Sequence, residues 1–164
     1  MSVNLNNIKE QIQGIFEAAN TTTAANDLSS GLQTRVKKIA KLNPTRIPLQ
    51  SSWYPFVTCY VSGKTMPQQD IALTQVSGKR RGEIEIKIVG AVWNSIYTNK
   101  DVDEADDDCE SLMENIEEIL RNNSTLVGTV TWSLPESVTY HSTNVDEGCN
   151  IRAGILTLKA RIFY

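Results

Sequence analysis

The sequence has little of the chemistry on which enzymes and metal sites depend. Its 164 residues include three cysteines and one histidine. Cys59, Cys109 and Cys149 are far apart and form no CxxC pair, which excludes the usual redox and zinc motifs. His141 has no second histidine, cysteine or paired acid at the spacing of a metal site or triad, so we interpret it as a surface-loop residue. The chain is therefore expected to have no catalytic residue, metal or cofactor, and not to be an enzyme.

Long apolar runs and an excess of basic charge are also missing. No stretch approaches the ~18 apolar residues of a membrane span, and the first residues lack the basic and apolar regions of a signal peptide. These absences predict a soluble protein made in a reducing cytoplasm. The net charge of −3 argues against nucleic acid as the main partner, because phosphate binding needs a positive surface. Neither glycine-rich phosphate-binding pattern is present, so no nucleotide site is predicted.

What the sequence does have is the composition of a folded domain. Hydrophobic residues make up 40% of the chain and charged residues 21%, which is far from the signature of disorder. The length fits a single domain over residues 1–164. Apolar residues recur at steps of three and four over residues 4–19, which predicts an amphipathic helix.

A second amphipathic helix is predicted over residues 101–121. Asp101 and Glu104 resemble a capping box. Four further carboxylates lie where the helix dipole favours negative charge: Asp103, Asp106, Asp107 and Asp108. Such a run could suggest calcium, yet it lacks the glycine and the twelfth-position glutamate of an EF-hand loop. We interpret it as a solvated helix start.

The remaining regular segments have the patterns of β-strands. They cover residues 56–61, 71–76, 83–88, 126–134 and 152–164. Residues 34–41 fit a helix or a strand, and we favour a strand. Ser62 and Gly63 are expected to end the first of the clear strands, and Cys59 to face inward as a small hydrophobic residue. The last strand is expected to lie inside the sheet.

Together these elements predict an α+β fold. The sheet should be mixed or antiparallel, with the two main helices packed on one face. An irregular inserted segment is expected at about residues 20–52, because Ser, Thr and Asn are frequent there and Pro44 and Pro48 interrupt regular structure.

The most suggestive charged feature is a basic loop at residues 77–82. Lys79, Arg80 and Arg81 lie there between two glycines. The loop is either an exposed hairpin tip kept soluble by its charge or a surface that docks onto an acidic partner. It is followed by a strand in which Glu83, Glu85 and Lys87 alternate with isoleucines. One face of that strand should be core, and the other should face water or an interface.

The order of these elements resembles that of the tail terminator (tail completion) proteins of long-tailed bacteriophages. The first helix is followed by the strand Tyr54-Pro55-Phe56-Val57-Thr58-Cys59-Tyr60-Val61-Ser62-Gly63, a long hairpin ending in Glu83-Ile84-Glu85-Ile86-Lys87-Ile88, a helix with an acidic start, and two strands. The specific points are an aromatic-Pro-x-Val-x-x-Tyr-x-x-Gly strand after a proline-rich loop and a last strand that ends in aromatic residues. The similarity covers the whole chain and is best from Tyr54 onwards, while the segment 20–52 is longer than in that family.

The resemblance implies a structural virion protein at the neck of the tail, made in the bacterial host. Such proteins form a ring, here expected to be a hexamer, that caps the tail tube, stops its polymerisation and joins tail to head. The implied partners are the chain itself, the tube protein, a head-tail connector and, in a contractile tail, the sheath, with DNA passing through the ring. By analogy, the loop 79–82 would reach an adjoining ring, and Glu83, Glu85 and Lys87 would face a neighbour or the lumen. The alternatives are another neck protein of similar build and a small enzyme on a ferredoxin-like scaffold.

Overall fold

The computed structural model describes residues 4–46, 50–66, 81–95 and 102–163. Its helices are α1 (Leu5–Ala19) and α2 (Val102–Asn122), with short 3-10 helices η1 (Pro44–Arg46) and η2 (Ser51–Trp53). Its strands are β1 (Lys38–Ala40), β2 (Phe56–Thr65), β3 (Arg81–Ser95), β4 (Trp132–Asp146) and β5 (Cys149–Phe163). They form one sheet in the order β1-β2-β3-β5-β4. Because β1 is parallel to β2 and the other neighbours are antiparallel, the sheet is mixed.

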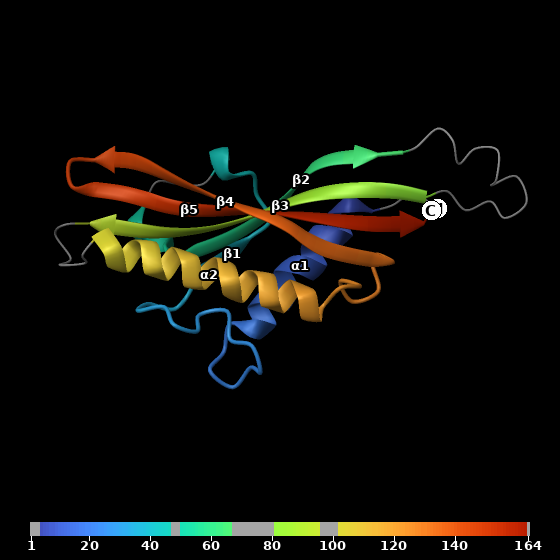
Figure 1. Cartoon of the computed structure of the whole chain (residues 1–164), viewed down its shortest axis with the longest axis horizontal. Coiled ribbons are helices and arrows are strands. Elements are labelled where there is room, and N and C mark those ends of the chain that lie inside the picture. The colour runs from blue at the N-terminus through green and yellow to red at the C-terminus, as the bar shows by residue number, and fades with distance from the viewer. Residues whose placement is uncertain (1–3, 47–49, 67–80, 96–101, 164) are drawn as a thin grey trace, which may run out of the picture.

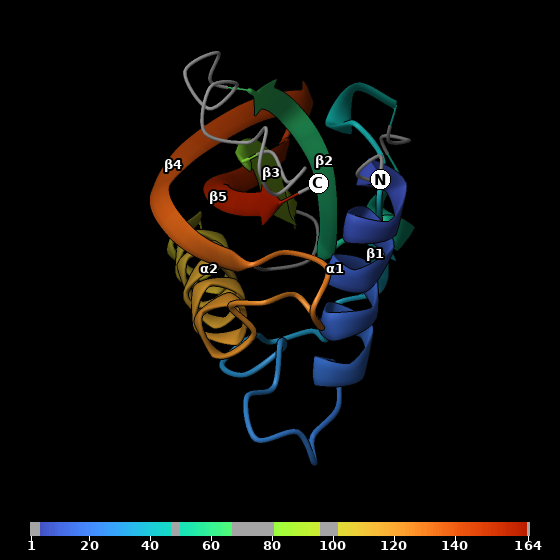
Figure 2. The same cartoon turned by 90° about the vertical axis from the view of Figure 1, so that its right-hand side faces the viewer.

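Both long helices lie on the same face of this sheet (Figures 1 and 2). α2 packs under β3, β5 and β4, and α1 packs under β1 and β2. The predicted α+β fold is confirmed, and so is the interior position of the last strand. The first predicted helix is also confirmed, and it begins after Asn4, whose side-chain oxygen accepts hydrogen bonds from the backbone N–H groups of Asn6 and Asn7. Neither α1 nor α2 is apolar enough over its length to be a membrane-spanning helix, a finding that concerns the described ranges.

Alternating side chains on the central strands build the core between the sheet and the helices. Ile84, Ile86 and Ile88 of β3 are fully buried on the helix-bearing face. The helical residues that join them in the core are Ile8, Ile12, Phe16, Cys109, Leu112, Met113, Ile116, Ile119 and Leu120. A slip of one residue in β3 would turn all three isoleucines to the opposite face, so their burial fixes the register.

Two glycines allow α2 to approach the middle of the sheet closely. Gly90 of β3 and Gly154 of β5 are cross-strand partners. A Cβ atom at Gly90 would lie 2.9 Å from Met113 Sδ and 3.0 Å from Leu112 Cδ2. At Gly154 it would overlap Met113 Cγ and lie 2.7 Å from Met113 Sδ. The helix therefore crosses the sheet where two neighbouring positions have no side chain.

The boundaries of several strands differ from the sequence-based predictions. β2 does not end at Ser62-Gly63 but continues to Thr65, because an irregularity between Val61 and Gly63 absorbs one residue of the register. The predicted strand at 34–41 contains only the short β1. The predicted strand at 71–76 lies outside the described residues.

The largest error concerns the predicted strand at 126–134. Leu126 and Val127 have φ angles of 45° and 58°, followed by Gly128 at 80°. These left-handed conformations form a turn, and the strand begins only at Trp132. Leu126 is fully buried, so its burial in the core fixes a backbone conformation that its residue type disfavours.

Two further interpretations were wrong in detail. His141 is exposed as expected, but it lies within β4 and not in a loop. Asp108 is not part of a solvated helix start, because its side chain is buried and its Oδ1 accepts a hydrogen bond of 3.4 Å from the Gln33 backbone N–H. Helical periodicity turns this carboxylate toward the segment that follows α1.

Candidate protein interface

The face of the sheet opposite the helices carries the predicted interface residues of β3. Because side chains alternate along a strand, the burial of the isoleucines places Glu83, Glu85 and Lys87 on this helix-free face. The paired strand β5 places Lys159 and Arg161 on the same face. Together with Arg81 at the start of β3, four of the six residues that the sequence predicted for an interface are thus on one surface.

An ordered set of polar contacts joins these side chains. Lys87 Nζ lies 3.3 Å from Glu85 Oε1 and donates a hydrogen bond of 2.7 Å to Thr157 Oγ1. Lys159 Nζ lies 2.9 Å from Glu136 Oε1 of β4 and 4.0 Å from Glu83 Oε1. We call this set, Glu83, Glu85, Lys87, Glu136, Thr157 and Lys159, the charged ladder. Opposite charges across strands stabilise the sheet locally and present a patterned, polar surface.

The charged ladder also shifts the acidity of its members. The hydrogen bond from Ser62 Oγ, 2.8 Å from Glu85 Oε1, and then the Lys87 ammonium lower the pKa of Glu85. The hydrogen bond to Glu136 and its negative charge raise the pKa of Lys159. Both shifts favour the charged forms of Glu85 and Lys159.

Large apolar side chains are exposed at the same end of the helix-free face. Trp132, Leu134 and Phe163 are 40%, 41% and 55% exposed. The guanidinium of Arg161 lies 5.3 Å from the ring centroid of Trp132, a cation–π contact. Aromatic and basic groups beside a polar ladder are typical of surfaces that bind other proteins.

At the other end of this face, aromatic residues form a second small cluster. Tyr54 and Phe56 make an edge-to-face contact with centroids 4.9 Å apart, and Trp93 lies 5.4 Å from Tyr54. Ala91 and Ile151 are buried with them. Unlike the end with Trp132, this end is covered by its own residues, including Trp53 of η2.

The predicted interface residues of the basic loop are only partly described by the structure. Arg81 is exposed at the start of β3, next to Phe163 in the register of β5. Lys79 and Arg80 lie outside the described residues. Sequence reasoning missed Glu136, Lys159 and Trp132 as neighbours of β3. The alternation of β5 was visible, but the pairing of β3 with β5 and of β5 with β4 could not be deduced from it.

Two of the three cysteine thiols are buried in the core. Burial raises the pKa of Cys59 and of Cys109 to about 12. In the described part of the chain, no three His, Cys, Asp or Glu side chains are grouped so that they could hold a metal ion. Cys59 and Cys109 therefore act as small core residues at neutral pH.

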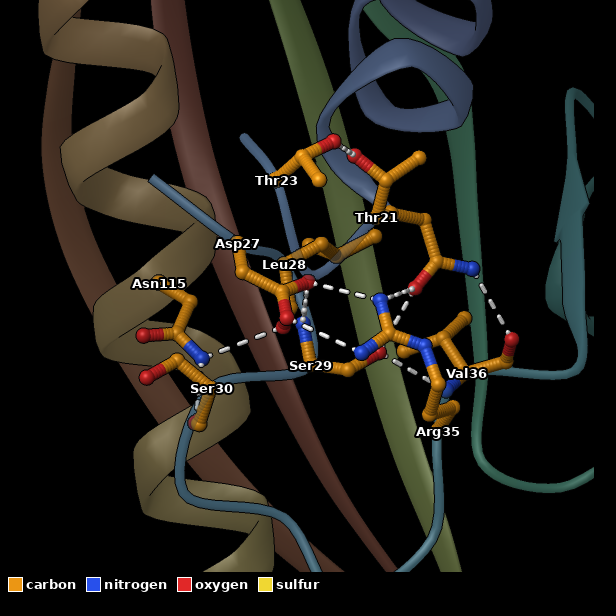
Figure 3. Close-up of polar contacts among 10 residues, drawn as sticks. Thr21, Thr23, Asp27, Leu28, Ser29, Ser30, Arg35, Val36 and Asn115 are labelled. Atoms are coloured by element: carbon orange, nitrogen blue, oxygen red, sulfur yellow. Dashed lines mark hydrogen bonds and ion pairs between the residues drawn. The ribbon is translucent and has the colours of Figure 1, made fainter. Parts of the chain in front are cut away.

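A second polar cluster joins the segment after α1 to both helices (Figure 3). Arg35 donates two hydrogen bonds to the Asp27 carboxylate, at 2.9 and 2.8 Å, and one of 3.2 Å to Asn20 Oδ1. Ser29 Oγ donates to Asn20 Oδ1 at 2.6 Å and accepts from the Val36 backbone N–H at 3.0 Å. These bonds give the segment 20–36 a fixed shape without helix or strand.

The charge of Asp27 is stabilised within this cluster. The hydrogen bonds from Arg35 lower the pKa of Asp27, and the same contact raises the pKa of Arg35. On the opposite side, Asn115 of α2 donates to the carbonyl oxygens of Leu28 and Ser30, at 3.1 and 2.8 Å. All these groups bond to one another or to the backbone, so we assign the cluster a structural role.

No family model and no curated protein sequence matches this chain. A function is therefore inferred from the arrangement of its residues. The strongest feature is the helix-free face, where the charged ladder lies beside exposed aromatic residues.

Proposed function

We propose that the chain is a structural virion protein that forms a ring, expected to be hexameric, on the tail tube of a long-tailed bacteriophage. The ring would terminate tube polymerisation and provide the surface that joins the tail to the head. The observation that carries the proposal is the helix-free face. A five-stranded sheet with both helices on one side leaves the other side for partners, and exposed Trp132, Leu134 and Phe163 lie beside the charged ladder there.

The composition of this face favours protein binding over small-molecule chemistry. Its charged groups pair with one another, along β3 and between β3, β5 and β4. An enzyme on this scaffold would need a pocket with titratable groups of shifted pKa, whereas the shifted thiols are buried and inactive. Exposed aromatic and arginine side chains are the groups that most often dominate binding between proteins.

The order of the elements supports the same class of protein. α1, β2, the β2–β3 connection, β3, the acidic helix α2 and the final strands β4 and β5 follow one another as in tail terminator proteins. In this proposal the charged ladder faces a neighbouring subunit or the lumen of the ring. The basic loop that ends at Arg81 contacts the tube. Further partners would be the head-tail connector and, in a contractile tail, the sheath, and the protein would reside at the neck of the virion.

The proposal is tested first by the mass and shape of the purified protein. We expect light scattering and electron microscopy to show a six-membered ring, or a monomer that forms a ring once tail tubes are added. A monomer or dimer that ignores tubes would overturn the proposal. Binding to the portal side of the neck alone would instead assign the chain to another class of neck protein.

A second test concerns the basic loop. The variant Lys79→Glu, Arg80→Glu, Arg81→Glu should dock onto tubes at least about tenfold more weakly, since charge complementarity steers such contacts. A control with Thr22→Glu and Thr23→Glu in the exposed turn after α1 should dock normally. Unchanged docking of the loop variant, with an unchanged melting temperature, would refute the role of the loop.

A further inference from the structure

The two lateral sides of the molecule differ in charge. On one side α2 lies under β4, the edge strand of the sheet. On the other side residues 35–46, which include β1, lie next to β2 (Figure 2). The sequence of α2 is dominated by Asp and Glu, with Arg121 as its one basic residue. Residues 35–46 contain no acidic residue and five basic ones: Arg35, Lys37, Lys38, Lys41 and Arg46. Arg35 and Lys41 pair with Asp27 and Glu10, so Lys37, Lys38 and Arg46 give this side its positive charge, opposite the acidic α2.

Helix α2 packs against β4, and two of its carboxylates lie near Tyr140 of that strand. Burial raises the pKa of Tyr140 of β4, and the charges of Glu110 and Glu114 raise it further. Both glutamates are exposed. We call β4 together with Glu110 and Glu114 the acidic side.

β4 is an edge strand whose middle lacks the usual protection against pairing. Each of its two ends is protected by an irregularity in its register with β5. Pro135 and Glu136 lie at the first irregularity, and Asp146 lies at the second. Between them, residues 137–144 contain no charged residue and no proline, and all but the half-buried Val138 are exposed. An uncharged, regular edge of this kind is a template for another strand.

The opposite edge of the sheet is paired by β1 over only a short stretch. β1 pairs with β2 only from Phe56 to Thr58. Beyond that point, Tyr60 and Val61 of β2 line a groove of about 510 Å³ together with Lys9, Lys41 and Arg46. We call residues 35–46 with this outer edge of β2 the basic side.

We propose that the acidic side of one copy docks against the basic side of the next copy, with residues 137–144 of β4 placed along the outer edge of β2. The inference rests on the proposed ring and names the two surfaces that would join its subunits. β2 and β4 run in opposite directions in the sheet, so copies related by rotation about an axis roughly parallel to the strands would pair antiparallel. A contact between two different surfaces of one chain is the kind that closes into a ring.

A charge-swap experiment tests this pairing. Variant A carries Glu110→Lys and Glu114→Lys, and variant B carries Lys37→Glu and Arg46→Glu. All four positions are exposed, and none of them takes part in an ion pair among the described residues. Each variant alone would have two sides of like charge, so its assembly should weaken at least about tenfold. An equimolar mixture restores both kinds of contact and should give rings in which A and B alternate.

The control variant carries Glu17→Lys, at an exposed glutamate of α1 that lies away from the acidic side. It should assemble like the wild type. Normal rings from A alone or B alone, or a mixture that assembles no better than either variant, would overturn the proposed pairing while leaving the ring itself intact. A wild-type chain that never forms rings would instead overturn the proposed function, so the two failures are distinguishable.

Cysteine cross-linking then identifies the strands. The experiment uses the single variants His141→Cys and Tyr60→Cys, each in a Cys149→Ser background. His141 of β4 and Tyr60 of β2 both lie on the helix-free face. Residues on neighbouring strands of one sheet are close enough to form a disulfide. The mixture of the two single variants should cross-link, and neither variant should do so alone. Thr139→Cys and Thr143→Cys test the neighbouring registers on the same face. Rings that form without a cross-link at any of the three positions, or His141→Cys cross-linking to itself, would refute the pairing of β4 with β2.

Discussion

Replacing Gly154 with alanine tests the close contact between α2 and the sheet. The added Cβ would overlap Met113 Cγ and lie 2.7 Å from its Sδ, distances at which the helix or the side chain must move. Overpacking of a closely packed core costs about 1–3 kcal/mol. The loss of glycine's freedom in the unfolded chain offsets about 0.4–1 kcal/mol of this. We therefore expect Gly154→Ala to lower the free energy of unfolding by roughly 1–2 kcal/mol.

The assay is urea unfolding followed by circular dichroism, with Gly14→Ala as the matched control. A Cβ at Gly14, in the exposed part of α1, meets no atom within 4 Å. This control should be stabilised by roughly 0.5–1 kcal/mol, because alanine is the better helix former. Combining Gly154→Ala with Met113→Ala should cost less than the sum of the two single changes, since the second removes the atoms that the first strikes. A Gly154→Ala variant as stable as the wild type would refute the reasoning.

Three other predictions follow from the local chemistry. Because the pKa of Asp27 is lowered in the folded protein, its carboxylate stabilises the fold at pH values above its unfolded pKa, and this contribution is lost as the pH falls through the lower folded pKa. Asp27→Asn should therefore reduce the urea midpoint at about pH 7 but hardly at about pH 2. With pKa values raised to about 12, Cys59 and Cys109 should resist alkylation at about pH 8 until the protein unfolds, while the half-exposed Cys149 reacts first, as peptide mass spectrometry would show. Val127, 68% exposed with a φ of 58°, should gain about 1 kcal/mol of stability on replacement by glycine, and an unchanged melting temperature would argue against strain there.

The sequence predicted those parts of the fold that periodicity determines. The isoleucines of β3 and the apolar stripe of α2 were correctly assigned to the core, because burial of a regular pattern permits one orientation. The turn at Leu126 could not be predicted in this way. Leucine and valine favour strands or helices locally, and only the burial of Leu126 against the rest of the core explains the left-handed backbone.

For a similar reason, only part of the arrangement of the candidate interface residues could be predicted from the sequence. Alternation showed that Glu83, Glu85 and Lys87 share a face, but their partners depend on which strands are neighbours. Glu136 reaches the charged ladder only because β4 pairs with β5. Such long-range pairings leave no trace in the local pattern of either strand.

The acidity of α2 extends beyond the turn that its dipole stabilises. The dipole acts within the first turn, whereas Glu110, Glu114 and Glu118 repeat at steps of four farther along the exposed surface. Like charges at this spacing destabilise a helix by about 0.2–0.5 kcal/mol per pair, and a basic neighbour would relieve that repulsion. Added salt should therefore stabilise the fold of the single subunit and weaken the association between copies.

Between about 0.1 M and about 1 M sodium chloride, the Debye length falls from about 10 Å to about 3 Å. Screening should raise the melting temperature of the non-assembling variant Lys37→Glu, Arg46→Glu, because its glutamates repel one another less. The same change should dissociate wild-type rings, because the attraction between their acidic and basic sides is screened as well. Differential scanning calorimetry and light scattering across one salt series measure both effects. If salt raised the melting temperature of the variant and also strengthened the wild-type rings, the contact between copies would be apolar, and the charges of α2 would have another role.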